Sequence, residues 1–277
     1  TSLSVDNQND KENYYGSAIH GYYENGDNGW GSTVIEGGGL ASRNGVRQTS
    51  TTWNNILTYD KTFNEKHHIN VMAGQEFYHF QHEYMYAYGE GISMPNMYEL
   101  YSTTSNKSIS SYTDKYSLMS YLGKAEYSFD NRYYVSASLR RDGSSRFSSE
   151  SRWGNFFSTG ASWRISKEKF MEGTSKWLNN LSLKASYGTT GNDNVNSYYA
   201  YQGTYASTDA DGVTVNMYTT PGLTVNAKAA PNLKWEKNQQ FNAGFDMSAF
   251  DNRLNATVEY FSRKAKDLLY YRELPLS

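Results

Sequence analysis

The acidic side chains are the first residues of this chain to consider for chemistry, and one cluster resembles a metal-binding loop. Asp209, Asp211 and Gly212 match the start of a calcium loop, but the twelfth position of such a loop requires a glutamate and here holds Thr220. We therefore predict a turn rather than a calcium site at this segment.

The histidines are the second set of side chains that can bind a metal, since imidazole is the commonest metal ligand in proteins. Four of them lie at His67, His68, His79 and His82. His79 and His82 are three residues apart, which places them on opposite faces of a strand and prevents them from sharing an ion unless the chain bends. We predict no metal site and no cofactor.

The sequence also lacks the residue sets that catalysis requires. It has no Ser-His-Asp set, no GxSxG elbow and no phosphate-binding glycine loop. Glu168 and Glu172 are paired acids of the kind used in acid–base catalysis, but they lie on a short connecting segment, far from any expected substrate. We therefore predict that the chain is not an enzyme.

Tyrosines in two long polar segments form the best candidate binding surface. Residues 89–112 hold Met94, Met97, Tyr98 and Tyr101, and residues 191–233 hold several more tyrosines among Asn, Thr and Gly, namely Tyr198, Tyr199, Tyr201, Tyr205 and Tyr218. Aromatic faces with interleaved amides suit sugar rings, and they equally suit a peptide or a partner protein. Tyrosine also packs loops at a low entropic cost, so packing alone is an equally good explanation.

The composition narrows the class of protein that carries these loops. The chain has 277 residues, no cysteine, a formal net charge of -2 and 26 tyrosines. No window approaches the roughly 18 apolar residues of a membrane-spanning helix. The near-neutral charge gives no reason to expect a nucleic-acid partner. The N-terminus lacks a signal-peptide pattern, so we expect that a signal was removed or that the chain is a piece of a longer protein.

The polar chain nevertheless has strands with one apolar and one polar face. Between residues 116 and 165 the apolar and polar side chains alternate with a period of two. The predicted strands cover residues 14–25, 46–60, 67–88, 113–129, 132–141, 152–165, 181–190, 234–249 and 253–264. We predict that one face points to lipid, with Val135, Leu139, Ala243 and Val258, and that the other points to a lumen, with Ser136, Arg140, Asp246 and Glu259.

The connections between these strands alternate in length. The short ones lie at 61–66, 166–180, Asp130-Asn131 and Asp251-Asn252, and Asn and Asp suit tight hairpins because they tolerate positive φ. The long ones lie at 26–45, 89–112, 142–151 and 191–233. Short periplasmic turns and long extracellular loops are typical of outer-membrane β-barrels, whereas a soluble sandwich shows no such regular alternation.

Aromatic residues gather beside the short turns, as in the girdles of membrane barrels. They are Tyr127, Phe129 and Tyr133 at one turn and Phe245, Phe250 and Tyr260 at another. The alternative is that Tyr and Phe simply have a high β-propensity. Nine strands leave two open edges, which lipid does not tolerate, so we expect the segment to need further strands and not to work alone.

Four stretches resemble the barrel of the SusC/RagA-type TonB-dependent transporters of Bacteroidetes. They are YLGKAEYSFDNRYYVSASLRRDGSSRF from Tyr121, WGNFFSTGASWRISKEKFM from Trp153, LSLKASYGTTGN from Leu181 and PNLKWEKNQQFNAGFDMSAFDNRLNATVEYF from Pro231. The resemblance implies an all-β fold, namely an arc of about nine antiparallel strands from a 22-stranded plugged barrel in the outer membrane. It also implies that residues 1–277 are barrel, without the family's plug and N-terminal domains.

The motif RRDGSSRF lies where a strand leaves the membrane. In a structural role, Asp142-Gly143 forms a turn, and Arg140, Arg141 and Arg146 pair with carboxylates or lipopolysaccharide phosphates. In a functional role, the arginines line the substrate vestibule, and Arg140 and Arg146 join the candidate contacts. The resemblance favours the structural role, because family members with different substrates share the motif.

The resemblance implies an importer of glycans or peptides that works with a SusD-like surface lipoprotein and is energised by TonB. Outer-membrane lipid and lipopolysaccharide are the further partners expected. The alternative is a surface protein that does not transport, such as an adhesin or a carbohydrate-binding module.

Overall fold

The computed structural model describes residues 1–16, 22–25, 29–32, 39–92, 94, 96–195, 197–208 and 222–270. For residues 22–25, 29–32, 204–208 and 222–227 it describes the backbone only. Nine strands of this part form the main sheet: β1 (Ser2–Gly16), β4 (Gly39–Phe63), β5 (His67–Ile92), β6 (Ser105–Phe129), β7 (Tyr133–Ser144), β8 (Trp153–Arg164), β9 (Leu178–Asn192), β12 (Glu236–Ala249) and β13 (Leu254–Lys266).

The remaining elements lie in the connections. The hairpins β2 (Tyr22–Asn25) with β3 (Gly29–Ser32) and β10 (Thr204–Thr208) with β11 (Gly222–Ala227) form separate two-stranded sheets. Three 3-10 helices complete the set: η1 (Leu100–Ser102), η2 (Ile165–Lys167) and η3 (Lys169–Thr174). None of the helices in the described residues has the length and hydropathy needed to cross a membrane.

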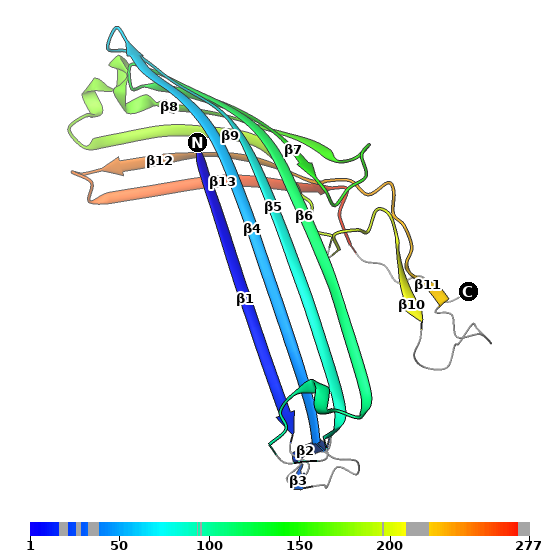
Figure 1. Cartoon of the computed structure of the whole chain (residues 1–277). Coiled ribbons are helices and arrows are strands. Elements are labelled where there is room, and N and C mark those ends of the chain that lie inside the picture. Colours follow the sequence, from blue (N-terminus) through cyan, green and yellow to red (C-terminus); the bar gives the residue numbers. More distant parts are fainter. Residues whose placement is uncertain are drawn as a thin grey trace. The chain divides into compact units, whose positions relative to one another are not determined.

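The main sheet is a meander with the strand order β1-β4-β5-β6-β7-β8-β9-β12-β13 (Figure 1). By its internal contacts the chain divides into two compact units. Unit 1 comprises 1–3, 53–78 and 117–277, and unit 2 comprises 4–52 and 79–116.

Most predicted strands are confirmed, but the first is wrong and several are too short. The first strand of the sheet is Ser2–Gly16, not 14–25. The run from Val5 to Asn13 is polar and lacks the residues that favour strands, so here pairing overrides local propensity. Strands β4, β5 and β6 have 25, 26 and 25 residues, whereas a membrane-spanning strand needs about 9–11. More than half of each of these strands therefore lies beyond the thickness of a membrane.

The short turns are tight hairpins, as predicted. Asp130 and Asn131 have φ values of 49° and 51°, and the N–H of Arg132 donates to the carbonyl of Phe129 at 2.9 Å. The turn at Asp251-Asn252 has φ values of 55° and 62°. Two successive residues with positive φ match the twist of the flanking strands, which is why Asn and Asp stand there.

The registers of unit 1 align the apolar positions of neighbouring strands into rows. One row runs across six strands through Tyr127, Val135, Ala161, Ala185, Ala243 and Tyr260. The polar row beside it runs through Glu126, Ser136, Gly160, Ser186 and Asn242. A slip of one residue in any pair would mix the two faces, so the pattern specifies the register.

These rows confirm that the residues predicted for the apolar face lie on one side of the sheet and that those predicted for the polar face lie on the other. Val258 pairs with Phe245, which lies two residues from Ala243 on β12 and therefore on the same face. Glu259 pairs with Gly244, which lies between Ala243 and Phe245 and therefore on the opposite face. On the apolar face Val135 is 51% and Leu139 62% exposed, so this face is not covered by the described protein.

Buried apolar side chains are few in the described residues, and three of them form one cluster. Phe147, Phe156 and Trp235 are the buried members, with ring centroids 5.4 Å apart for both pairs that include Trp235. The indole N–H of Trp235 donates to the carbonyl of Arg152 at 2.8 Å. The cluster therefore ties the segment before β12 to the connection between β7 and β8.

Candidate ligand-binding surfaces

Aromatic rings line both ends of the apolar face in unit 1. At the short turns, Phe129, Tyr133 and Trp163 stack in sequence with centroids 6.3 and 6.4 Å apart, and Trp177 contacts Phe250 at 6.2 Å. At the other end, Tyr121 stacks on Trp153 at 6.1 Å and Phe157 contacts Tyr187 at 5.9 Å. The predicted clustering of rings is confirmed for Phe129 with Tyr133 and for Phe250, whose partner is Trp177.

The separation of the two aromatic rows fits the apolar band of a membrane barrel. Along β7, Tyr133 lies in one row and Arg141 reaches the other, where its guanidinium lies 5.0 Å from the centroid of Trp153. These eight steps cover roughly 27 Å along the strand, which is about 20 Å along the membrane normal for a strand tilted by about 40°, against a band about 25 Å tall. An arginine over an indole at this depth keeps its charge at the interface.

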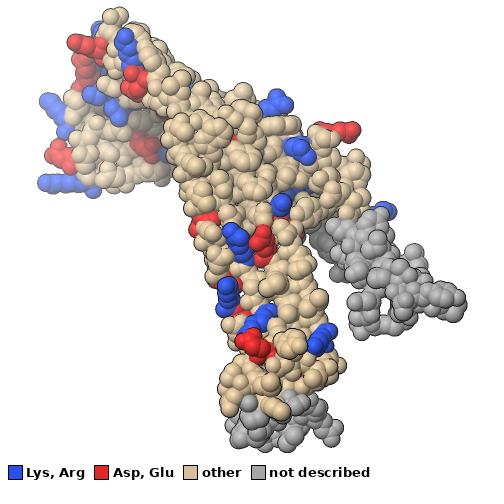
Figure 2. Space-filling view, in the orientation of Figure 1, with Lys and Arg blue, Asp and Glu red and all other residues tan. Residues whose placement is uncertain are grey.

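Charged side chains gather around the short turns after β4 and β8, at the upper left in Figure 2. Glu168 is the central acceptor there, because it receives bonds from the Tyr133 hydroxyl at 2.5 Å, the Trp163 indole at 3.0 Å and Arg132 at 3.3 Å. Arg132 also pairs with Asp130. The hydrogen bonds from Tyr133 and then Trp163, with the nearby Arg132, lower the pKa of Glu168.

This arrangement gives Glu168 a role in holding the connecting segment. Its side chain is only 12% exposed, and the three donors come from β7, β8 and the turn before β7. Glu172, in contrast, is exposed. The geometry therefore fits a structural clamp at the rim rather than an acid–base pair.

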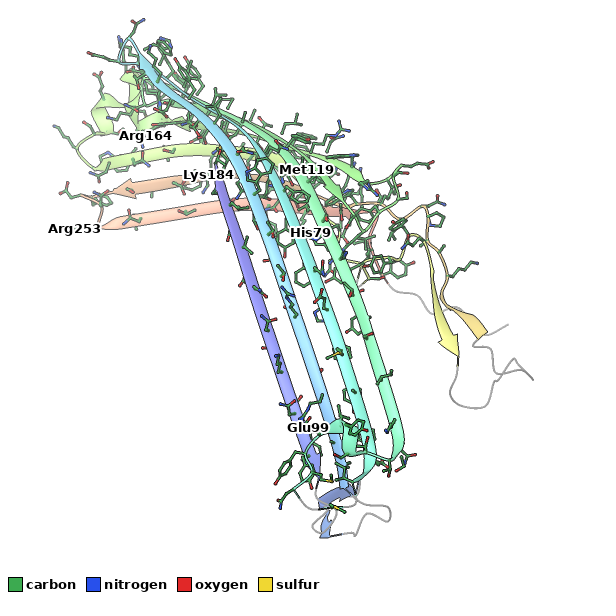
Figure 3. All side chains as sticks on the ribbon, in the orientation of Figure 1. His79, Glu99, Met119, Arg164, Lys184 and Arg253 are labelled. Carbon is green, nitrogen blue, oxygen red and sulfur yellow. The ribbon has the colours of Figure 1, made fainter. Side chains whose placement is uncertain are left out.

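The polar face of unit 1 carries ion pairs between neighbouring strands. Lys184 of β9 (Figure 3) lies 3.3 Å from Asp246 of β12 and 3.7 Å from Glu259 of β13. Arg140 pairs with Asp142 at 2.8 Å and with Glu76 at 3.5 Å. These groups stand on the face predicted to line the lumen, where water and ligands meet the wall.

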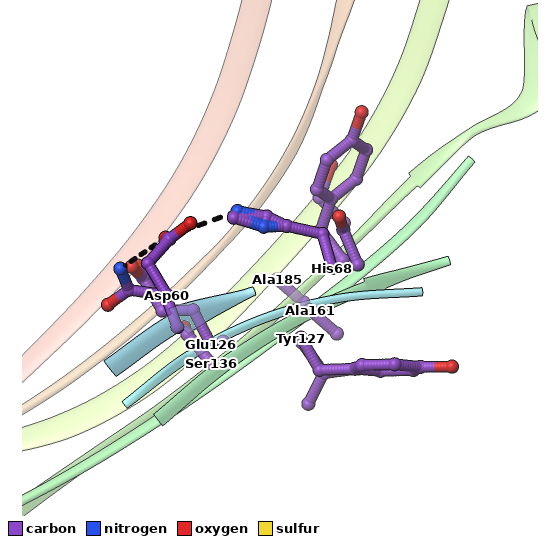
Figure 4. A pocket seen from close by; sticks show the side chains of 13 residues that line it. Asp60, His68, Glu126, Tyr127, Ser136, Ala161 and Ala185 are labelled. Atoms are coloured by element: carbon purple, nitrogen blue, oxygen red, sulfur yellow. Dashed lines mark hydrogen bonds and ion pairs between the residues drawn. The ribbon is translucent and has the colours of Figure 1, made fainter. Parts of the chain in front are cut away.

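A hollow of about 480 Å³ lies on unit 1 and is lined by β4 to β9 (Figure 4). Asp60 and His68 point toward one another across 3.3 Å, and Asn70 donates to Asp60 at 2.7 Å. Glu126 and Ser136 stand beside them in the lining. In the described part of the chain no group of three or more His, Asp or Glu residues is placed to hold a metal ion.

The RRDGSSRF motif does not form the predicted turn at Asp142-Gly143. Both residues lie inside β7, paired with Gly154 and Trp153 of β8, and the turn begins at Ser145. A Cβ on Gly143 would lie 2.9 Å from the Trp153 ring. The glycine is needed to let the indole cross the backbone, and the Asp142 carboxylate accepts from Arg140 rather than shaping a turn.

Arg146 and Tyr198, both predicted as candidate contacts, come together. The Arg146 guanidinium lies 5.1 Å from the ring centroid of Tyr198 and donates to the carbonyl of Asp193 at 3.2 Å. Tyr198 in turn contacts Tyr199 edge to face at 6.3 Å. The pairing of the motif's arginines with carboxylates is confirmed for Arg140 with Asp142 and for Arg146 with Asp193, at 4.0 Å.

The other candidates do not join this cluster. In unit 2, Tyr98 packs edge-on against Tyr15 at 4.7 Å, and Tyr101 is 96% exposed. Tyr201 is partly buried in unit 1, and of Tyr205 only the backbone is described. Tyr218 and the calcium-like Asp209, Asp211 and Gly212 lie outside the described residues.

One row of aromatic side chains is absent from the sequence-based candidates. From residue 78 to 88 every even position of β5 is aromatic: Tyr78, Phe80, His82, Tyr84, Tyr86 and Tyr88. The signal was a period of two, which marks one face of a strand. Residues 67–88 fit the pattern of a strand in the barrel wall, so the predicted binding surface includes only the loop that follows them.

The comparisons with known proteins all indicate the same family. A family model described as "TonB dependent receptor-like, beta-barrel" matches residues 1–276. TonB-dependent receptor P3 of Formosa agariphila is 30% identical over 249 residues, which cover 88% of this chain and 24% of the relative. TonB-dependent receptor SusC of Bacteroides thetaiotaomicron is 31% identical over 215 residues, 75% of this chain and 20% of SusC.

A solved structure shows the same arrangement of strands. A chain of the RagAB peptide transporter matches with a TM-score of 0.84 and 28% identity, covering 99% of this chain and 28% of that chain. The chain thus spans about a quarter of the length of the relatives it matches. The apolar band, the aromatic rows and these matches together show that this chain belongs to the TonB-dependent receptor-like β-barrel family and forms part of an outer-membrane barrel of the SusC/RagA type.

Proposed function

We propose that the chain forms wall and outer surface of a TonB-dependent importer that carries oligosaccharide or peptide across the outer membrane. The observation that carries the proposal is the pair of rows in unit 1. Apolar side chains from Val135 to Ala243 form one row, and polar ones from Ser136 to Asn242 form the other. Such a wall separates lipid from a polar interior.

The names of the relatives support uptake of nutrients. SusC is named a TonB-dependent receptor, and RagAB is named a peptide transporter. The proposal extends this activity to the protein that contains this chain, with TonB as the source of energy and a SusD-like surface lipoprotein as the partner. Lipid and lipopolysaccharide contact the apolar face and its rim, where Arg141 lies beside Trp153.

The long strands support an exposed outer part. Strands β4, β5 and β6 supply far more residues than a bilayer needs, and the hairpins β2–β3 and β10–β11 lie in the long connections. These parts offer the surface on which a substrate or a lipoprotein is first met.

Uptake by intact cells tests the proposal. The gene for the full-length protein is deleted, and uptake of labelled oligosaccharides and peptides is compared with that of cells carrying the restored gene, with and without TonB. We expect uptake of at least one probe to require both the gene and TonB. Uptake that is unchanged after deletion of the gene, or that persists without TonB, would contradict the proposal.

A further inference from the structure

Strand β6 is much longer than its neighbour β7, and this difference leaves part of one β6 edge unpaired. The pairing with β7 begins at Leu118 and runs to the end of β6, whereas β6 itself begins at Ser105. In the described part of the chain, no strand pairs with residues 107–113 on this side. We call residues 107–113 the open edge of β6.

Hydrogen bonds near the other end of β6 show which residues direct their backbone groups to the open edge. The carbonyl of Ser117 accepts from the N–H of Ser145, on the β7 side, at 2.9 Å. Asp130, just after β6, donates its N–H instead to the carbonyl of Lys66, beside β5, at 2.7 Å. Successive residues of a strand direct their groups to opposite sides, so odd positions of β6 face β7 and even positions face β5. Four odd residues lie in the open edge: Lys107, Ile109, Ser111 and Thr113.

The backbone groups of the open edge are accessible and poorly protected. Every residue from Ser105 to Thr113 is exposed, and Ile109 is 86% exposed. Proteins usually protect such an edge with charges, proline or a bulge, because it is a template for another strand. Residues 108–113 contain no charged residue and no proline, and Ile109, Tyr112 and Thr113 favour strands. We therefore expect the open edge to have a permanent neighbour in the complete protein.

The chemistry of the open edge selects an extended polypeptide. Its N–H and C=O groups recur at every second residue, about 6.8 Å apart along the strand. The backbone of another strand has the same repeat, so it can satisfy these donors and acceptors in succession, as in strand addition. About seven extended residues would cover the open edge, which is about 20 Å long.

We propose that a segment of the full-length protein from outside residues 1–277 adds to the open edge of β6 as a further strand. This chain spans about a quarter of the length of the relatives it matches, so about three quarters of a protein of that length lies outside it. A segment of the same polypeptide is tethered to the edge, and its high effective concentration favours it over a separate protein. It also covers the edge as soon as the barrel has folded, which prevents pairing between molecules.

Hydrogen exchange of the full-length protein in detergent, without a lipoprotein or cargo, tests the pairing. Ser108 and Ser110 are matched controls in the same strand, because their N–H groups point to β5. We expect the amides of Ile109 and Ser111 to exchange as slowly as the controls, at least about a hundredfold more slowly than an unprotected amide. Fast exchange of these two amides would overturn the proposal. Protection that appears only after a surface lipoprotein or a peptide is added would overturn it as well.

Photo-cross-linking identifies the neighbour. The photoreactive residue p-benzoylphenylalanine is placed at Thr113 of the full-length protein, and the cross-linked peptides are identified by mass spectrometry. We expect a product with the mass of one chain, linked to a segment outside residues 1–277, because side chains opposite one another on paired strands lie about 5 Å apart. The control position is Met85 on β5, which has β4 and β6 as neighbours and should cross-link within residues 1–277.

The other possible neighbours give different products at Thr113. A product with the mass of two chains would identify a second copy, and a product with another protein would identify a separate partner. Cross-links confined to residues 1–277 would show that this chain covers its own edge. Each of these three results would overturn the proposal, and none of them depends on which substrate the importer carries.

Discussion

The guanidinium of Arg146 lies 5.1 Å from the ring centroid of Tyr198, although 52 positions separate the two residues in the chain. The same arginine donates to the Asp193 carbonyl and, at 3.3 Å, to the Asn194 side chain. Its side chain is only 16% exposed. The last arginine of RRDGSSRF therefore holds the start of the long connection between β9 and β12.

Replacing Arg146 should loosen that connection. For Arg146→Ala we expect a loss of about 1–3 kcal/mol in unfolding free energy, since charge-assisted hydrogen bonds are lost. Arg146→Lys should recover only part of it, because lysine lacks the planar fork of donors. Limited proteolysis of residues 193–235 in the full-length protein measures the effect. Lys237→Ala, at an exposed position of β12, is the control, and equal cleavage in both variants would contradict the assignment.

The two faces of β7 should respond differently to charge. Val135→Arg places a cation in the apolar row and should cost about 2–4 kcal/mol near the middle of the membrane, whereas Ser136→Arg, on the polar row, should cost much less. A folding titration of the full-length protein into lipid vesicles compares the two. Equal losses of folding free energy in the two variants would contradict the assignment of the two faces.

Gly143 and Gly123 form a matched pair of strand glycines. Gly143→Ala would bring a Cβ to 2.9 Å from the Trp153 ring, while a Cβ at Gly123 would meet nothing within 4 Å. We expect Gly143→Ala to destabilise the protein by about 1–3 kcal/mol through overpacking, and Gly123→Ala to be neutral or mildly stabilising. Denaturant unfolding followed by tryptophan fluorescence tests this, and a neutral Gly143→Ala would show that the indole moves freely.

The Glu168 clamp should weaken in acid. Its pKa is lowered in the folded protein by the Tyr133 and Trp163 hydrogen bonds and by Arg132, so ionised Glu168 favours the folded rim. That stability is present above the ordinary carboxyl pKa of 4.5 and is lost as the pH falls below it through the lowered value. Asp130, whose pKa is lowered by its hydrogen bond with Arg132, contributes in the same direction.

Removing the carboxylate should flatten this dependence. Glu168→Gln should reduce the loss of stability between neutral and acidic pH, and Asp130→Asn should reduce it separately. Unfolding midpoints measured across this pH range provide the check. A Glu168→Gln variant with the full acid sensitivity of the unmutated protein would show that the clamp does not depend on charge.

The topology can be tested on intact cells. We expect an epitope inserted at Asp211, in the long connection between β9 and β12, to be labelled from outside, and one inserted at Asn131 to be hidden. Labelling of the Asn131 epitope, with the outer membrane shown to be sealed, would mean that the barrel is oriented the other way.

Much of the wall could be predicted from the sequence alone, because its rules are local. Alternation with a period of two separated Val135 from Ser136, and Asp130-Asn131 marked a hairpin since these residues tolerate positive φ. The number of strands in the sheet and the aromatic rows beside the turns followed from the same patterns.

What the tertiary structure decided depends on partners distant in the chain. The polar run of β1 becomes a strand only as the neighbour of β4, and Asp142-Gly143 stays in β7 because Trp153 of the next strand lies across it. Likewise, the period of two in β5, which the sequence analysis did not use, puts Tyr84 on one face with its neighbours, but only strand pairing brings Tyr112 against it. Local sequence specifies which face a side chain takes, whereas register and strand length depend on backbone pairing between segments, which no local pattern contains.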